Sequence, residues 1–192
     1  MPAIHETAYP RLKSTITQKD LTDAYTPTEA EVKLATFIAK GFPARLCFLL
    51  LLKTFQRLGY FMLLKEVPTL IHEYIWAQLG MERMLPDVSS YDLSGTRQRH
   101  VQIIRKHVGV KPFDAEAQSI MTEAFRESAQ SKEDLTDLIN IGIEELIRCR
   151  FELPGFSTLC EKAQRVRAYV NKGFYRNVND TIGDDGRMVM AT

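Results

Sequence analysis

The amino-acid sequence predicts an all-α, multi-helical protein with two helical subdomains that contain helix-turn-helix-like units. Apolar residues recur at helical spacing along most of the 192-residue chain, and no stretch alternates polar and apolar residues as a half-buried strand would. Prolines, capping residues and glycines mark helix ends throughout the chain. A hydrophobic content of 45% is sufficient for a packed core.

The first helical subdomain is expected at residues 26–84, after an N-terminal arm at residues 1–25. It begins with the sequence TPTE, in which the first threonine caps the helix and the proline occupies its first turn. The second of its three helices is apolar nearly all round, so it should pack between the other two. The helices are predicted to follow Thr26, Pro43 and Pro68 and to end at Gly41, Gly59 and Gly80.

Residues 85–95 are predicted to be a linker, because the sequence around them is rich in serine and aspartate and contains a proline and a glycine. The second helical subdomain is expected at residues 96–175, followed by a flexible tail at residues 176–192. Its helices are predicted near residues 96–108, 115–129, 132–150 and 158–172. Asp114 and Ser131 would cap the second and third, and Thr158 with Glu161 would form a capping box for the last.

The composition favours a cytoplasmic protein that does not cross a membrane. The three cysteines are widely separated and form no C-x-x-C pair, which is typical of a protein in a reducing compartment. The N-terminal sequence lacks the apolar centre of a signal peptide. The longest apolar run, Leu46–Leu52, is far shorter than the roughly 20 residues of a membrane span.

Basic residues are concentrated in the helix expected at residues 96–108. No acidic residue lies between Asp92 and Asp114, although the formal net charge of the whole chain is only +1. An apolar stripe on this helix faces inward, and long polar side chains occupy the opposite side. Arginine and glutamine can reach base edges from a helix in the major groove, and neighbouring cations bind phosphates. The predicted DNA-contacting residues here are Arg97, Arg99, Gln102, Arg105, Lys106 and Lys111.

The last predicted helix repeats this pattern of an apolar inner stripe and a basic outer face. It supplies a second set of candidate DNA-contacting residues: Arg165, Arg167, Lys172 and Arg176. Arg45 and Lys53 are weaker candidates, because their helix is predicted to be mostly buried. For any one helix considered alone, a charged stripe also fits a solvated surface with no partner.

The segment from Asp114 to Glu145 is strongly acidic, with only Arg126 and Lys132 opposing nine carboxylates. This segregation of charge leaves a protein–protein interaction module open as an alternative, with the acidic 114–145 surface as its binding face. Failure to bind any DNA at low salt would favour that alternative.

The sequence offers no convincing catalytic, cofactor or metal site. His100 and His107 are seven residues apart, about 10 Å along a helix, which is too far to share one zinc ion. His72 lies on an apolar helix and is expected to be a packed core residue. No phosphate-binding glycine loop, nucleophile elbow or H-E-x-x-H sequence is found. A small helical enzyme therefore remains only a second alternative.

Three stretches resemble the N-terminal region of Tn-three family transposases, the enzymes of replicative bacterial transposons. RLCFLLLLKTFQRLGYFMLLKEVPTLIHEYIWAQLG at residues 45–80 is similar to an apolar helix, an "LG" break and a "VP" helix that ends in "QLG". TRQRHVQIIRKHVGVKPF at residues 96–113 and RFELPGFSTLCEKAQRVRAYVN at residues 150–171 resemble the two basic stretches that follow in the family. The matches occur in family order and span about residues 40–175.

The resemblance implies a multi-helical region that binds double-stranded DNA at the terminal inverted repeats of a transposon. It also implies that the partners are those DNA ends and, in addition, the rest of a transposase or a second copy. The catalytic core of the family is RNase H-like, binds magnesium and lies far downstream of this region. We therefore expect sequence-specific DNA binding without catalysis or a cofactor in residues 1–192.

Overall fold

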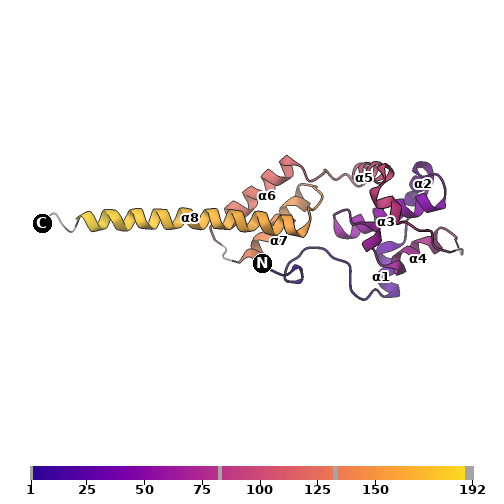
Figure 1. Cartoon of the computed structure of the whole chain (residues 1–192), viewed down its shortest axis with the longest axis horizontal. Coiled ribbons are helices and arrows are strands. Elements are labelled where there is room, and N and C mark those ends of the chain that lie inside the picture. Colours follow the sequence, from indigo (N-terminus) through magenta and orange to yellow (C-terminus); the bar gives the residue numbers. More distant parts are fainter. Residues whose placement is uncertain (1, 82–83, 132–133, 189–192) are drawn as a thin grey trace. The chain divides into compact units, whose positions relative to one another are not determined.

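The computed structural model describes residues 2–81, 84–131 and 134–188, with side chains in the last helix as far as Lys172. This part of the chain contains eight α-helices and three short 3-10 helices but no strand, so the all-α prediction is confirmed (Figure 1). The chain divides into two compact units. Pro10–Lys111 form the central unit, and Met1–Tyr9 together with Pro112–Thr192 form the terminal unit.

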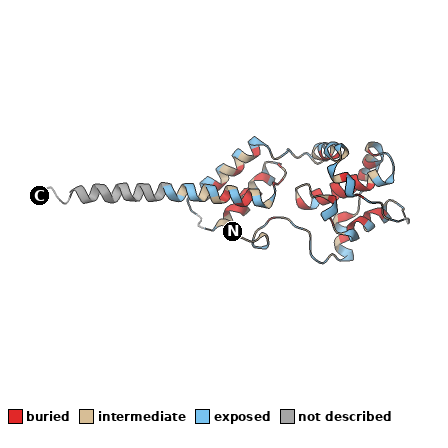
Figure 2. Cartoon of the chain, in the orientation of Figure 1, coloured by how far each residue is buried: buried red, intermediate tan, exposed pale blue. Residues whose placement is uncertain are grey.

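The central unit is built around α3, whose residues 46–55 are all buried (Figure 2). Helices α1, α2, α4 and α5 each pack against it, or against a helix that does, which confirms the prediction of a helix enclosed by neighbours. Its α-helices are α1 (Gln18–Tyr25), α2 (Glu29–Ile38), α3 (Phe42–Leu58), α4 (Thr69–Gln78) and α5 (Gly95–Val108). Two 3-10 helices, η2 (Leu64–Glu66) and η3 (Ser89–Leu93), lie between them in the chain.

Local interactions set the ends of α2 and α3. The Thr28 side chain accepts a hydrogen bond from the Glu31 amide at 3.2 Å, and the Glu31 carboxylate accepts one from the Thr28 amide at 2.7 Å. This capping box starts α2 two residues after the predicted cap Thr26, because Thr28 and Glu31 supply the capping side chains. Gly41 then adopts φ +83°, a conformation that favours glycine, and turns the chain into α3.

The terminal unit consists of η1 (Ile4–Glu6), α6 (Ala115–Ser128), α7 (Leu135–Arg148) and α8 (Phe156–Met188). The three α-helices pack against one another. Residues from the start of the chain join them, since the Tyr9 hydroxyl donates to the Pro154 carbonyl at 2.8 Å and the Ala8 amide donates to Asn140 Oδ1 at 2.7 Å. The Tyr9 ring also lies 5.4 Å from that of Phe156.

The boundary between the units differs from the predicted one. The sequence analysis placed residues 96–108 in the second subdomain, but α5 belongs to the central unit, because Val101 and Ile104 are buried in the same core as α3. The predicted linker at residues 85–95 is part of this core as well, with Val88 and Tyr91 both buried. The polar, proline-containing composition of this segment predicted a linker although two of its side chains are buried. The two units divide between Lys111 and Pro112.

The two ends of the chain also differ from prediction. Residues 1–25 do not form one arm, because residues 1–9 join the terminal unit while α1 packs on α3 and α4 through Leu21 and Tyr25. At the other end, α8 begins at Phe156, so Thr158 lies inside the helix and not at its cap. The helix extends into the predicted tail as far as Met188, since no proline interrupts it, and residues 189–192 lie outside the described part.

Candidate nucleic-acid interface

The outer face of α5 carries three of the predicted DNA-contacting residues. Arg99, Gln102 and Lys106 are exposed and follow one another at spacings of three and four residues, which places them on one strip of the helix. The opposite side of α5 is held in the core by His100, Val101 and Ile104. Among the described residues, neither Arg99 nor Lys106 forms an ion pair, so both positive charges are available to an anionic partner.

Arg97 lies on the inner side of α5 and does not belong to this strip. Its side chain is only 17% exposed, and its Nε lies 3.4 Å from Asp92 Oδ1. One terminal nitrogen donates to the carbonyl oxygens of Phe61 and Met62 at 3.4 and 3.2 Å. Arg97 therefore fixes α5 to the preceding loop instead of facing solvent, and we remove it from the candidate set.

Asp92 completes the attachment of α5 to the rest of the central unit. Its two carboxylate oxygens accept hydrogen bonds from the backbone amides of Leu64 and Lys65 at 2.9 and 3.1 Å. The carboxylate thus links η2, η3 and the first turn of α5. Because its partners are two backbone amides and the Arg97 guanidinium, the position of α5 is set by charge-assisted hydrogen bonds and an ion pair as well as by apolar packing.

Arg105 and Lys111 have environments different from those of the exposed strip. The Arg105 guanidinium lies over the Phe61 ring at 5.4 Å from its centroid, a cation–π contact at the edge of α5. Lys111 is exposed and is the last residue of the central unit. Both residues make further interactions within the chain, so they are secondary members of the candidate interface.

A hollow of about 470 Å³ lies beside the exposed strip, between α5 and the turn that joins α2 to α3. Lys40 and Arg99 bring positive charge to it, and Thr96 brings a hydroxyl. None of its lining residues in the described part of the chain is acidic, although the whole chain is almost neutral. Its lining residues are Ile38, Ala39, Lys40, Ala44, Thr96, Arg99, His100 and Ile103. Lys40 was missed by the sequence analysis, because only the packing of α2 against the core brings it next to α5.

Arg45, a weaker candidate from the sequence, lies at the start of α3 beside this hollow. Its Nε donates to the Ala39 carbonyl at 3.3 Å, and its guanidinium lies 5.2 Å from the centroid of the Phe42 ring. Lys53, the other weaker candidate, is buried and forms an ion pair with Glu31 at 3.3 Å. The structure therefore keeps Arg45 near the candidate interface and assigns Lys53 to the core.

The second predicted set, on α8, is not gathered on one face. Arg165 and Lys172 are exposed and seven residues apart, hence on the same side of the helix, whereas Arg167 points to another side and is half-buried. Arg165 lies 3.9 Å from Glu161 of its own helix. Arg167 lines a hollow that also contains Glu6 and Asp134, whose charges oppose its own. The Arg176 side chain lies outside the described residues.

Several carboxylates of the acidic 114–145 segment have structural partners. Asp114 caps α6 by accepting hydrogen bonds from the Glu116 and Ala117 amides, and Asp134 caps α7 through the Thr136 amide. Glu123 pairs with Arg126, and Glu145 pairs with Arg148. Four carboxylates of the segment thus have structural roles, and Lys132 and Glu133 lie outside the described residues.

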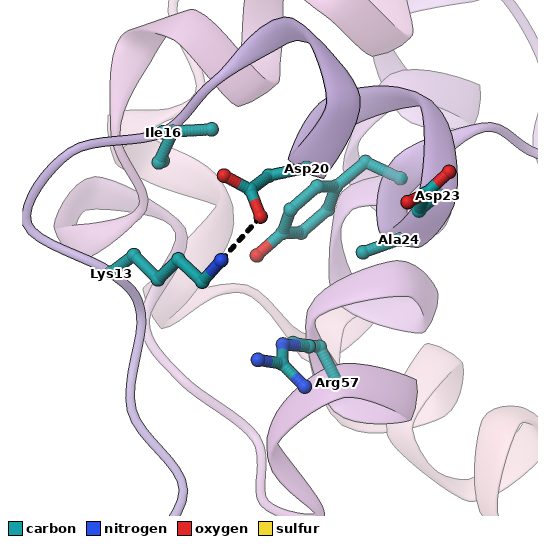
Figure 3. A pocket seen from close by; sticks show the side chains of 7 residues that line it. Lys13, Ile16, Asp20, Asp23, Ala24 and Arg57 are labelled. Carbon is teal, nitrogen blue, oxygen red and sulfur yellow. Dashed lines mark hydrogen bonds and ion pairs between the residues drawn. The ribbon is translucent and has the colours of Figure 1, made fainter.

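A second hollow in the central unit, of about 310 Å³, carries balanced charge (Figure 3). Lys13 Nζ lies 2.5 Å from Asp20 Oδ1, and this ion pair, together with hydrogen bonds from Thr17, lowers the pKa of Asp20. Tyr25 also lines this hollow, and burial raises the pKa of its hydroxyl. Asp23 and Arg57 complete the charged lining, so two cations face two carboxylates and the hollow does not favour an anion.

The buried histidines serve the core. His100 Nδ1 lies 2.7 Å from the Tyr91 hydroxyl, and its ring meets the Phe48 ring edge-on at 5.2 Å. Burial, with a contribution from Arg99, lowers the pKa of His100 to about 4. Burial also lowers the pKa of His72, which confirms the prediction of a packed core residue. In the described part of the chain, no cluster of three or more histidine, cysteine or acidic residues could hold a metal ion.

No helix in the described ranges is both long enough and apolar enough to span a bilayer. Among known protein families, the one described as a domain of unknown function, DUF4158, matches residues 1–166. No curated protein matches the chain.

Proposed function

Because the chain belongs to the DUF4158 family, for which no function is established, we propose its function from its geometry: it binds double-stranded DNA through the exposed face of α5. The observation that carries the proposal is the strip of Arg99, Gln102 and Lys106 beside a hollow without acidic lining residues. A helix that is anchored on one side and carries long cationic and amide side chains on the other has the chemistry for major-groove reading.

The roles of the three side chains differ. Arg99 and Gln102 have the donor geometry for guanine and adenine edges, respectively, while Lys106 and Lys40 supply positive charge for phosphates. The contacts of these lysines with the DNA phosphates would provide most of the affinity and make it depend on salt concentration. Asp92 and Arg97 act indirectly, because they hold α5 in its position.

The resemblance to Tn-three family transposases supports a more specific proposal. The cognate DNA would be the terminal inverted repeats of a transposon, and the chain would act as the recognition part of a transposase in the cytoplasm. Cys47, Cys149 and Cys160 are free thiols, as a reducing compartment requires. The rest of the transposase or a second copy of the chain are the proposed protein partners, and no step of catalysis is assigned to residues 1–192.

The test measures binding of the chain to an inverted-repeat duplex and to a scrambled duplex, with fluorescence anisotropy as the readout, at several salt concentrations. Replacing both Arg99 and Lys106 with alanine should weaken binding to both duplexes. It should also reduce the slope of log K against log salt by about 0.9, because the phosphate contact of Lys106 is lost. Replacing Lys33 and Lys65 with alanine removes the same charge from exposed sites outside the strip and should change the slope little.

The variant Gln102→Ala distinguishes recognition of the DNA sequence from electrostatic attraction to the DNA phosphates. This variant should lose discrimination between the cognate and scrambled duplexes while its salt slope stays the same, since glutamine is neutral. Equal binding of the R99A/K106A and K33A/K65A variants would contradict the proposed interface.

A protein-binding role for the terminal unit is the second candidate. Ile147 is exposed on α7 close to the exposed Glu144, so an apolar side chain and an uncompensated carboxylate share this surface. Absence of binding to any duplex at low salt would favour this candidate over the first.

A further inference from the structure

Phe37 is an exposed aromatic side chain in the last turn of α2. It is 91% exposed, the highest value for any described phenylalanine, whereas Ala35 on the inner side of the same helix is fully buried. Exposing a phenyl ring to water forgoes the free energy that its burial would supply, so a ring held outward is a candidate contact with a partner. The next residues along the chain, Ile38, Ala39 and Lys40, line the acid-free hollow beside α5.

The turn that carries Phe37 is held in place on both sides. On α2, the buried Glu31 carboxylate accepts from Gln56 Nε2 at 2.7 Å and pairs with Lys53, which fixes the helix to α3. Beyond the turn, Arg45 reaches back to the Ala39 carbonyl, and the Phe42 ring meets the Trp76 ring edge-on at 6.4 Å. The backbone under Phe37 is therefore tied to the core, and a ligand would meet a ring that is already positioned.

The charges around Phe37 favour an anionic partner. Lys40 lies three residues further along the chain, just beyond the end of α2, and lines the hollow together with Arg99. None of the described residues that line the hollow is acidic, so a polyanion that enters it meets the charges of Lys40 and Arg99. An exposed aromatic ring close in sequence to a lysine suits nucleic acid, whose bases offer an apolar surface between phosphates.

We propose that Phe37 is a wedge that enters the DNA minor groove next to the site of α5 and unstacks one base step. This proposal rests on the proposed function. Lys40 would neutralise the adjacent phosphate. Apolar side chains that open a base step in this way bend the duplex and bring more of its backbone against the protein. The chain would then read flexible pyrimidine–purine steps at this position by their deformability, without hydrogen bonds to the bases.

The experiment uses the whole chain and the duplex that it binds best, with 2-aminopurine placed at successive positions along the strand. Binding of the wild-type chain should raise the fluorescence at one step outside the bases contacted by α5, because unstacking relieves quenching. Phe37→Ala should abolish this rise and weaken binding about tenfold, and Phe37→Leu should retain part of both. End-to-end energy transfer across the duplex should show the loss of the bend in F37A.

Two controls keep the result specific. Thr36→Ala alters the neighbouring exposed position of α2 and should leave the fluorescence rise and the affinity unchanged. The melting temperature of F37A should equal that of the wild-type chain, because Phe37 makes little contact with the core. An affinity loss in F37A therefore cannot come from unfolding.

Three outcomes would overturn the wedge. If F37A raises the fluorescence as the wild-type chain does, Phe37 is not the wedge, although DNA binding stands. If F37A binds DNA normally but loses a self-association seen for the wild-type chain by sedimentation, Phe37 is a contact between chains. If the wild-type chain binds no duplex, the proposed function fails first and the wedge fails with it.

Discussion

Glu31 and Lys53 are charged side chains in the core of the central unit, only 5% and 8% exposed. Burial opposes ionisation of Glu31, but hydrogen bonds from the Thr28 amide and Gln56, together with the Lys53 ammonium, outweigh it and lower its pKa. One carboxylate thereby caps α2 and joins it to α3. The pair also explains why Lys53, a candidate from the sequence, does not face a ligand.

Glu31→Ala should lower the free energy of unfolding of the central unit by about 3 kcal/mol, because it leaves the buried Lys53 ammonium without a partner. The double replacement E31A/K53M should be more stable than E31A alone, since it also removes the unpaired charge. Urea unfolding monitored by Trp76 fluorescence measures both. A double variant as unstable as E31A would show that the lost cap, and not the unpaired ammonium, sets the cost.

His100 should make the central unit less stable in mild acid. Its pKa in the folded chain, about 4, lies below the ordinary value of 6.5, so between these values the unfolded chain binds more protons than the folded one. Stability is therefore lost as pH falls from 7.5 to 5, by about 2 kcal/mol from this residue. His72 and Glu31 add to the loss in the same direction.

Urea unfolding at pH 7.5 and pH 5 tests the role of His100. In His100→Gln, which keeps a polar side chain next to Tyr91, the difference between the two pH values should shrink. The variant His107→Gln, at an exposed position of the same helix, is the control and should keep the full difference. An unchanged difference in H100Q would assign the pH dependence to other groups.

Of the side chains predicted on α5, some are exposed as the helical pattern indicates and others are held by the core. The acid-free run from residue 93 to 113 identified α5, and its helical spacing separated Arg99, Gln102 and Lys106 from the apolar stripe. The same spacing also placed Arg97 among the candidates. Its partners Asp92, Phe61 and Met62 lie in other segments, and only tertiary packing brings them next to it. Lys40 was missed for the same reason.

At the scale of elements, α6 and α7 pack tightly against each other at Gly142. Gly142 lies in the middle of α7, and a Cβ added there would come within 2.3 Å of the Phe125 ring. Glycine weakens a helix interior, so its presence here reflects the space that Phe125 requires.

Gly142→Ala should destabilise the terminal unit by about 1–2 kcal/mol, because the steric cost of overpacking exceeds the gain in helix propensity. Gly95→Ala is the matched control, since nothing lies within 4 Å of its added Cβ, and it should be neutral or slightly stabilising. Thermal unfolding followed by circular dichroism measures both. Combining G142A with F125L should restore part of the loss.

At the scale of the whole molecule, the helices were predictable but their grouping was not. Helical periodicity is local and located seven of the eight α-helices, missing α1, whose Leu21 and Tyr25 provide only two inward positions. The division into units depends on contacts between distant residues. Tyr9 donates a hydrogen bond to Pro154, and Tyr91 of the predicted linker lies in the core of the central unit. Composition indicates neither of these two contacts.

Tyr9→Ala should destabilise the terminal unit by about 3 kcal/mol, because it removes a buried ring and its hydrogen bond to the Pro154 carbonyl. Hydrogen exchange should become faster in α6, α7 and the start of α8, and stay unchanged in α1 to α5. Tyr169→Ala removes an exposed ring from α8 and is the control. Faster exchange in the central unit instead would place the effect of Tyr9 there.

The attachment of residues 1–9 to the terminal unit has a consequence for synthesis on the ribosome. The central unit can fold as soon as Lys111 has left the exit tunnel, but Tyr9 has no docking site until Pro154 and Phe156 have been translated. The Tyr9 segment therefore leaves the tunnel before the central unit does but finds its native contacts after that unit can fold. A translational pause before residue 154 would leave the apolar Tyr9 segment available to chaperones while the central unit is already formed.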